Sequence, residues 1–248
     1  MASQDVFNAR LFHDRVAVVV GGTSGIGAAV AGALAACGAK VLVTGATASE
    51  VSAAALVHAG TAEGTVLDVR NDVAVSHFFG GLSRIDILVN CAGIIRRGAE
   101  HEPQVFADVV DVNLSGTLRC CAHARPLLAR QGGAIVNTAS MLSYFGGGLV
   151  PGYSASKGGV MQLTKSLAIA YASDGIRVNA VAPGWVRTAL TTVLQADASR
   201  EAAIVARTPL GRWAEPDDIA GAVLFLCSPA AAFVTGAILP VDGGYLAA

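Results

Sequence analysis

The sequence predicts an α/β fold in which a doubly wound parallel sheet carries helices on both faces. Short runs rich in β-branched residues alternate with helix-length segments, and right-handed crossovers between parallel strands place such helices on both sides of a sheet. The chain has 248 residues, of which 53% are hydrophobic and 14% charged. A chain of this length and hydrophobic content can bury a large core. No proline- or serine-rich linker and no internal repeat divides residues 1–248, so we expect one domain.

The expected elements follow one another in the order that such a sheet requires. Residues 15–20 form a run rich in valine that stops in glycines, as a strand buried on both faces does. Residues 26–37 are small and apolar, and Gly38 follows them as a helix C-cap would. Further strands are expected at residues 40–44, 64–67, 85–89, 134–138, 177–181 and 237–241. Helices are expected between them at residues 47–58, 71–82, 104–129, 154–173 and 216–227. The series predicts a single Rossmann-type domain with one irregular excursion at residues 187–213, a length typical of substrate lids.

Composition argues against several classes of protein. A net charge of −1 gives no sign of a nucleic-acid-binding surface, which is usually basic. Residues 219–241 carry no charge, but Pro229 and Pro240 interrupt them; we therefore expect a helix ending near Cys227, a turn and a short strand, and no membrane span. Residues 1–15 lack the apolar run of a secretory signal, which predicts a cytoplasmic protein. Five cysteines without a C-x-x-C pair and five scattered histidines predict neither disulfides nor a metal site.

A glycine-rich turn lies directly after the first strand and opens the first helix. It reads Gly-Gly-Thr-Ser-Gly-Ile-Gly over residues 21–27. Glycines let the backbone approach a pyrophosphate, and the helix N-terminus offers free N–H groups and partial positive charge to the phosphates. The turn therefore predicts a dinucleotide cofactor, with contacts from Gly21, Thr23, Ser24, Gly25, Ile26 and Gly27.

Further motifs downstream carry a family resemblance. Asn-Cys-Ala-Gly at residues 90–93 follows the fourth strand, Asn113 lies in a long helical segment, Ser140 ends a strand, and Tyr153 and Lys157 open a helix. With the glycine turn, these residues resemble the short-chain dehydrogenase/reductase family over nearly the whole chain, in order and in spacing. The resemblance implies an NAD(P)-dependent enzyme acting on CH–OH groups. A cofactor-binding regulatory protein without turnover is the alternative, but it predicts a damaged set of these residues.

Tyr153 and Lys157 are four residues apart, so on a helix both side chains point to one face. A phenol with a pKa of about 10 is a poor base at neutral pH. We expect the ammonium of Lys157 and the positive nicotinamide ring together to lower that pKa. The resemblance implies that Tyr153 exchanges a proton with the substrate, that Lys157 holds the nicotinamide ribose, that Ser140 binds the substrate oxygen and that Asn113 relays protons through water.

The resemblance also implies where the cofactor binds. Beyond the glycine turn, the implied contacts are Asp68, Val69, Asn90, Ala92, Gly93, Tyr153, Lys157, Pro183, Gly184, Val186 and Thr188. An acidic residue normally binds the ribose 2′-hydroxyl at the end of the second strand, but here the nearest acid is Glu50. No Arg or Lys occurs at residues 22–24 or 44–49 to meet a 2′-phosphate, so NAD is expected in preference to NADP.

Several stretches, among them residues 92–97 and 241–246, resemble bacterial 2-keto-3-deoxygluconate and gluconate dehydrogenases. This likeness implies that the small-molecule substrate is a sugar acid or a related polyol; a 3-oxoacyl thioester or another ketone is the alternative. Arg96 and Arg97 follow the fourth strand, where a guanidinium can bind a carboxylate, although both also fit a solvated surface. Met141 and Trp185 are expected to shape the rest of the pocket. The family resemblance further implies a homotetramer, or a homodimer.

Overall fold

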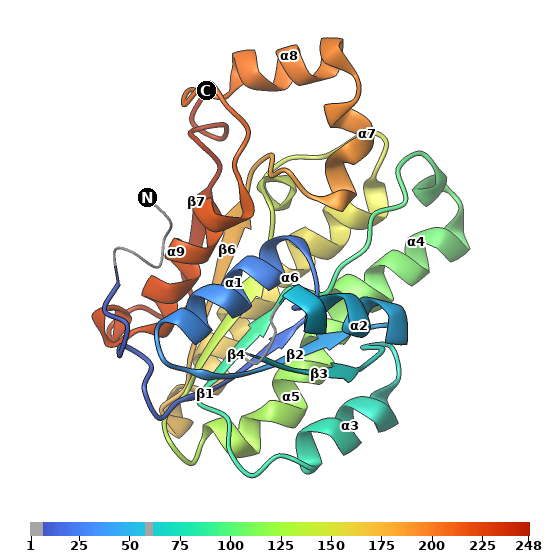
Figure 1. Cartoon of the computed structure of the whole chain (residues 1–248). Coiled ribbons are helices and arrows are strands. Elements are labelled where there is room, and N and C mark those ends of the chain that lie inside the picture. The colour runs from blue at the N-terminus through green and yellow to red at the C-terminus, as the bar shows by residue number, and fades with distance from the viewer. Residues whose placement is uncertain (1–6, 58–61) are drawn as a thin grey trace.

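The computed structural model describes residues 7–57 and 62–248. Their strands form one parallel sheet of seven in the order β3-β2-β1-β4-β5-β6-β7, with helices on both faces (Figure 1). The strands are β1 Val16–Val20, β2 Lys40–Gly45, β3 Ala62–Val66, β4 Ile87–Asn90, β5 Ala134–Thr138, β6 Arg177–Pro183 and β7 Ile238–Val241. The predicted fold class is therefore confirmed, and each strand lies within a few residues of its expected place.

The helices follow the expected alternation. They are α1 Gly25–Ala36, α2 Ala48–Val57, α3 Asp72–Gly80, α4 Pro103–Val110, α5 Gly116–Leu128, α6 Pro151–Ala170, α7 Thr192–Gln195, α8 Ala198–Arg207 and α9 Pro216–Cys227. The segment after α9 contains a short turn and then β7, as the prolines predict. The second predicted helix was expected to reach residue 58, which lies outside the described residues.

Alternate side chains of β1 enter two separate cores. Ala17 and Val19 pack with apolar residues of α1 and α9 on one face of the sheet. Val18 and Val20 pack with residues of α5 and α6 on the other face. Because side chains alternate along a strand, a run of valines without polar interruptions satisfies both faces at once.

Two predicted segments differ in detail. The helix expected at residues 104–129 is divided into α4 and α5 by one wider, π-helical turn, Asp111–Ser115. The excursion at residues 187–213 contains the helices α7 and α8, which extend beyond the sheet in Figure 1. Among residues 7–57 and 62–248, no helix has the length and apolar character needed to cross a bilayer.

Candidate active site

One cavity of about 740 Å³ opens at the carboxyl ends of the central strands. Five strands contribute to its wall at their carboxyl ends. Gly45, Thr138 and Pro183 are the last residues of β2, β5 and β6, and Gly21 and Cys91 directly follow β1 and β4. The chain continues from β1 to β2 on one side and places β4 on the other, so the strand order reverses at β1. In open parallel sheets, ligands bind in the crevice at such a switch point.

The glycine turn forms a close-fitting end of this cavity. A Cβ atom at Gly21 would lie 2.5 Å from the backbone nitrogen of Ala92, and one at Gly27 would lie 2.1 Å from the carbonyl oxygen of Gly21. Gly25 has a φ of +52°, and Ser24 precedes α1 as its N-cap without a side-chain capping bond. The glycines therefore let the turn pack closely against itself and against the loop after β4, and the start of α1 lines the cavity, which fits a pyrophosphate at the N–H groups of its first turn.

Lys157 lines the cavity, and its ammonium is hydrogen-bonded to a backbone carbonyl. Its Nζ donates a hydrogen bond of 2.6 Å to the carbonyl oxygen of Thr138, at the end of β5. The same Nζ lies 5.6 Å from the ring centroid of Tyr153, so the helix α6 does bring both side chains to one face. Lys157 is only 4% exposed, and burial lowers its pKa to about 8.

The side chain of Tyr153 is half-buried, and charges of both signs act on its phenol. Burial raises its pKa; a hydrogen bond with Ser140 and the charge of Arg97 lower it, and the charge of Glu100 raises it. We expected Lys157 and a bound nicotinamide together to lower this pKa. In the chain alone, burial is the largest effect on this pKa and raises it. The combined effect of Lys157 and a bound nicotinamide stays a prediction.

Ser140 caps a short 3-10 turn, Met141–Ser143, between β5 and α6. Its Oγ accepts a hydrogen bond of 3.1 Å from the backbone N–H of Leu142. Ser143, at the end of that turn, accepts from the N–H of Ser140 and donates to the carbonyl oxygen of Lys157 at 2.7 Å. The turn therefore fixes Ser140 relative to α6, within hydrogen-bonding reach of Tyr153.

Asn113 lies behind the cavity wall, and it does not line the cavity. It is fully buried in the π-helical turn; its Oδ1 accepts from the N–H of Ile94 at 2.8 Å, and its Nδ2 donates to the carbonyl of Ile94 and to Oγ of Ser156. The side chain thus joins the loop after β4 to α6. A proton relay through Asn113 stays a prediction.

The side chain of Asn90 is bound on one face of the sheet. Its side chain projects from the end of β4 toward α5, where Nδ2 donates to Oδ1 of Asn137 at 2.9 Å and to Sγ of Cys121 at 3.3 Å. It does not line the cavity. A residue inside the strand directs its side chain to a face of the sheet and not past its end. A cofactor contact of Asn90 stays a prediction.

The other predicted residues line the cavity, together with several that the sequence analysis did not assign. The predicted residues that line it are Gly21, Thr23, Ser24, Gly25, Ile26, Gly27, Asp68, Val69, Ala92, Gly93, Arg96, Ser140, Met141, Tyr153, Lys157, Pro183, Gly184, Trp185, Val186 and Thr188, and their roles stay predictions. Unassigned lining residues include Arg70, Val112, Phe145, Leu149 and Leu190. The last three are apolar residues of loops, and no sequence motif marked them.

The two arginines after β4 differ in position. Arg96 is exposed, whereas Arg97 is half-buried, and its charge reaches Tyr153. Burial and the charge of Arg200 lower the pKa of Arg97, and the charges of Glu100 and Tyr153 raise it. Within the described part of the chain, no carboxylate lies at ion-pair distance from Arg97.

Comparison with known proteins decides the family. The family model described as "Enoyl-(Acyl carrier protein) reductase" matches residues 20–246. The chain belongs to the short-chain dehydrogenase/reductase family. It is an NAD(P)-dependent oxidoreductase that interconverts a secondary alcohol and a ketone, as the sequence motifs predict.

Three similar proteins cover this short-chain dehydrogenase almost completely. A 2-dehydro-3-deoxy-D-gluconate 5-dehydrogenase of Pseudoalteromonas atlantica is 40% identical over 94% of this chain and 96% of its own. A cis-4-hydroxycyclohexanecarboxylate dehydrogenase of Sinomonas cyclohexanicum is 45% identical over 95% of this chain and 98% of its own. The crystal structure of a gluconate 5-dehydrogenase from Burkholderia cenocepacia, in complex with NADP and tartrate, has a TM-score of 0.90 at 33% identity, covering 97% of this chain and 98% of that one.

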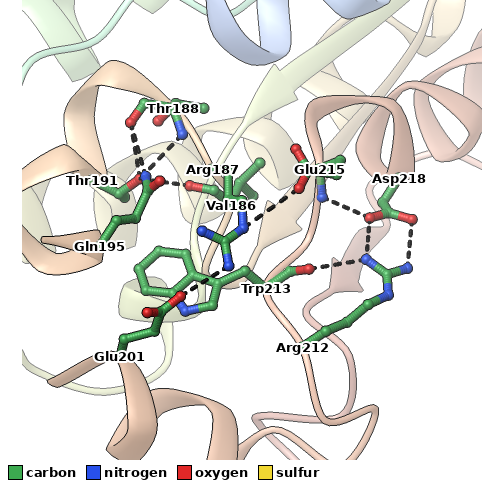
Figure 2. Close-up of polar contacts among 10 residues, drawn as sticks. All are labelled: Val186, Arg187, Thr188, Thr191, Gln195, Glu201, Arg212, Trp213, Glu215 and Asp218. Carbon is green, nitrogen blue, oxygen red and sulfur yellow. Dashed lines mark hydrogen bonds and ion pairs between the residues drawn. The ribbon is translucent and has the colours of Figure 1, made fainter. Parts of the chain in front are cut away.

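In this dehydrogenase, Arg187 anchors the excursion at its base (Figure 2). Its guanidinium pairs with Glu201 of α8 at 2.9 Å and with Glu215 at 3.5 Å, and it lies 5.7 Å from the ring centroid of Trp213. Oγ1 of Thr191 donates to the carbonyl oxygen of Val186 at 2.7 Å. These contacts join α7 and α8 to the segment that follows β6.

Proposed function

We propose that this enzyme oxidises and forms a secondary alcohol on a molecule that carries a carboxylate, such as a sugar acid. The half-buried guanidinium of Arg97 carries the proposal, because it lies in the cavity wall beside Tyr153 without a carboxylate partner among the described residues. A partly desolvated guanidinium favours an anionic ligand and binds a planar carboxylate with two parallel hydrogen bonds. The names of the two relatives described above each include a carboxylic acid.

In this proposal, each side chain around the cavity has its own role in the reaction. Tyr153 receives the alcohol proton during oxidation and returns it during reduction. Ser140 donates a hydrogen bond to the same substrate oxygen, and Lys157 holds the nicotinamide ribose and keeps positive charge near the phenol. Asn113 positions the loop after β4 through Ile94. A bound nicotinamide cofactor supplies the acceptor or donor of the hydride. The excursion at residues 187–213 closes over the substrate.

The substrate proposal is tested with a panel of sugar acids, neutral polyols and small ketones, read at the nicotinamide absorbance. For D-gluconate and similar acids, Arg97→Gln should lower kcat/KM by roughly 10- to 100-fold, because a charge-assisted pair contributes about 1.5–3 kcal/mol. Arg97→Lys keeps the charge and should lose less. Neutral polyols such as galactitol should be affected little by either change. Equal losses on acids and polyols would show that Arg97 does not bind the carboxylate.

We also propose that NAD is preferred over NADP, with Glu50 as the reason. Oε2 of Glu50 accepts a hydrogen bond of 2.7 Å from the N–H of Ala46, directly after β2, and both residues line the cavity. Arg70 is the cation that lines this end, and it is bound to the carboxylate of Asp68 at 2.6 Å. A 2′-phosphate at the end of β2 would therefore meet a carboxylate and no free cation.

The cofactor proposal predicts a kcat/KM with NAD that is at least roughly tenfold higher than with NADP. Only NADP carries a 2′-phosphate, which the carboxylate of Glu50 would repel. Glu50→Gln keeps the size of the side chain and removes its charge, so it should narrow that ratio mainly by improving NADP. Equal or better turnover of the unmodified enzyme with NADP would overturn the proposal.

A homotetrameric assembly and a cytoplasmic location complete the proposal. Ile169 of α6 is 81% exposed and Leu118 of α5 is 43% exposed, and such apolar side chains on adjoining helices fit an interface between subunits. A homodimer is the smaller alternative. All five cysteines lie in described residues as free thiols, which fits a reducing compartment.

A further inference from the structure

Glu100 is a buried carboxylate that the chemistry described above does not use. It belongs to a 3-10 turn, Ala99–His101, between β4 and α4, and it is only 1% exposed. It does not line the cavity, and no Arg, Lys or His of the described residues lies at ion-pair distance from it. A buried carboxylate without a cationic partner needs strong hydrogen bonds, since desolvation otherwise costs several kcal/mol.

Its two oxygens each accept one backbone N–H group. Oε1 accepts from Arg96 at 2.7 Å, and Oε2 accepts from Tyr153 at 2.7 Å. Tyr153 is the third residue of α6, so its N–H is one of the groups that the helix itself leaves without an acceptor. The partial positive charge of this helix end stabilises the carboxylate. A Cβ atom at Gly152 would lie 3.3 Å from Oε2, so the carboxylate packs closely against the first turn.

The two N–H groups belong to the segments that carry the reacting phenol and the free guanidinium. One is that of Tyr153 itself, and the other is that of Arg96, directly before Arg97. A single rigid carboxylate therefore sets how far the start of α6 lies from the loop after β4. Tyr153 and Arg97 must contact one substrate at two points, so their action depends on the distance between the two segments. A misplacement of about 1 Å can lower the reaction rate roughly 100-fold.

The carboxylate also acts on the phenol by its charge. The groups that face Tyr153 are Ser140 and Arg97, which lower its pKa, Glu100, which raises it, and Lys157, whose Nζ lies 5.6 Å from the ring centroid. Removing the charge of Glu100 should therefore lower the pKa of Tyr153. The charge of Glu100 also raises the pKa of Arg97, against the larger lowering by burial.

We propose that Glu100 is a positioning residue for this reaction: its carboxylate holds the backbone of Tyr153 and that of Arg96 at a fixed spacing. The part that concerns the substrate carboxylate rests on the function proposed for Arg97. The part that concerns Tyr153 does not depend on it.

The test compares Glu100→Gln and Glu100→Asp with the unmodified enzyme and with Glu102→Gln as a matched control on the surface. Glu100→Gln keeps the shape but removes the charge and turns an amide toward one of the two N–H groups. Glu100→Asp keeps the charge but is too short to reach both. Hydrogen exchange of peptides covering residues 94–98 and 151–156, and titration of Tyr153 by tyrosinate absorbance with Tyr153→Phe as the subtracted baseline, need no substrate.

We expect faster exchange in both peptides for both variants, and a lowered Tyr153 pKa in Glu100→Gln alone. With a substrate from the panel, kcat/KM should fall by roughly tenfold or more while the dissociation constant of NADH stays within about twofold, since Glu100 is outside the cavity. The acidic limb of the pH profile for oxidation should move to lower pH in Glu100→Gln.

The outcomes separate the two proposals. Unchanged exchange at Tyr153 and an unchanged titration would overturn the role of Glu100, as would a change at residues 94–98 alone. If Glu100→Gln does not fold, Glu100→Asp decides through exchange and kcat/KM. Arg97→Gln could leave kcat/KM for the acids unchanged while Glu100→Gln shifts the titration of Tyr153. That result would leave Glu100 as proposed and remove only the carboxylate-binding role of Arg97.

Discussion

The buried ammonium of Lys157 lowers the free energy of unfolding of this protein. Its pKa falls from an ordinary 10.5 to about 8 because burial penalises the ammonium. Below pH 8 the side chain is charged in both the folded and the unfolded states, so the full penalty applies. As the pH rises from about 8 toward 10.5, the folded state loses its proton first and the penalty disappears.

We therefore predict that Lys157→Met abolishes turnover but stabilises the fold at pH 7 by about 1–3 kcal/mol. The gain is the removed penalty, reduced by the loss of the hydrogen bond to Thr138. The difference between variant and unmodified enzyme should shrink between pH 7 and pH 9.5. Urea denaturation at both pH values measures it, and an equal or growing difference would contradict a buried, penalised ammonium.

Single residues differ in how far the sequence predicts them. The spacing of Tyr153 and Lys157 predicts a shared helix face because helix geometry is fixed, and the structure places them so. The side chains of Arg97 and Glu100 could not be placed in advance, because their directions depend on how the loop after β4 folds against α6. The motif at residues 90–93 likewise does not give the face of the sheet to which the side chain of Asn90 points.

At the scale of elements, the excursion of residues 187–213 is where tertiary contacts decide the structure. The sequence pattern predicts an irregular segment, whereas the structure contains α7 and α8. The apolar residues Leu194, Ile204 and Trp213 form a small cluster of their own there, separate from the two large cores. So few apolar positions in short helices give too weak a periodic pattern to be recognised. The sequence pattern also does not show the division of α4 from α5. At this turn Asn113 bonds to Ile94, a contact with a distant loop that periodicity does not reveal.

Arg187 gives the prediction at this scale. Arg187→Ala should free α8, because one guanidinium contacts Glu201, Glu215 and the ring of Trp213. Exposed ion pairs contribute little to global stability, so Tm should change by no more than about 4 °C. We expect faster hydrogen exchange over residues 192–207 and a KM for substrate raised several-fold.

Arg212→Ala is the matched control for that experiment. Arg212 pairs with Asp218 at 2.6 Å, on the side of Figure 2 away from α8. It should leave exchange over residues 192–207 unchanged. If both variants accelerate exchange there equally, the excursion is held by its general packing and not by Arg187.

At the scale of the whole molecule, the sheet explains why residues far apart in sequence meet in one site. Every strand of the described sheet runs in the same direction, so the segments that follow the central strands gather at one edge. The alternation of strands and helices predicts this edge, because parallel pairing and right-handed crossovers leave few other arrangements. The shape of the substrate end is not predictable in the same way, since loops and not strands form it.

The exposed apolar side chains of the outer helices lead to the prediction for the assembly. A tetramer of 25.0 kDa chains has a mass of about 100 kDa, which light scattering after gel filtration distinguishes from a dimer or a monomer. Ile169→Glu places a charge on a side chain that is 81% exposed in one chain, so it should leave the fold of that chain intact. In an assembly that buries Ile169, the same charge would be desolvated without a partner, so the variant should shift to a smaller species. An unchanged mass would show that α6 lies outside the interface, and a mass of 25 kDa for the unmodified enzyme would exclude the assembly altogether.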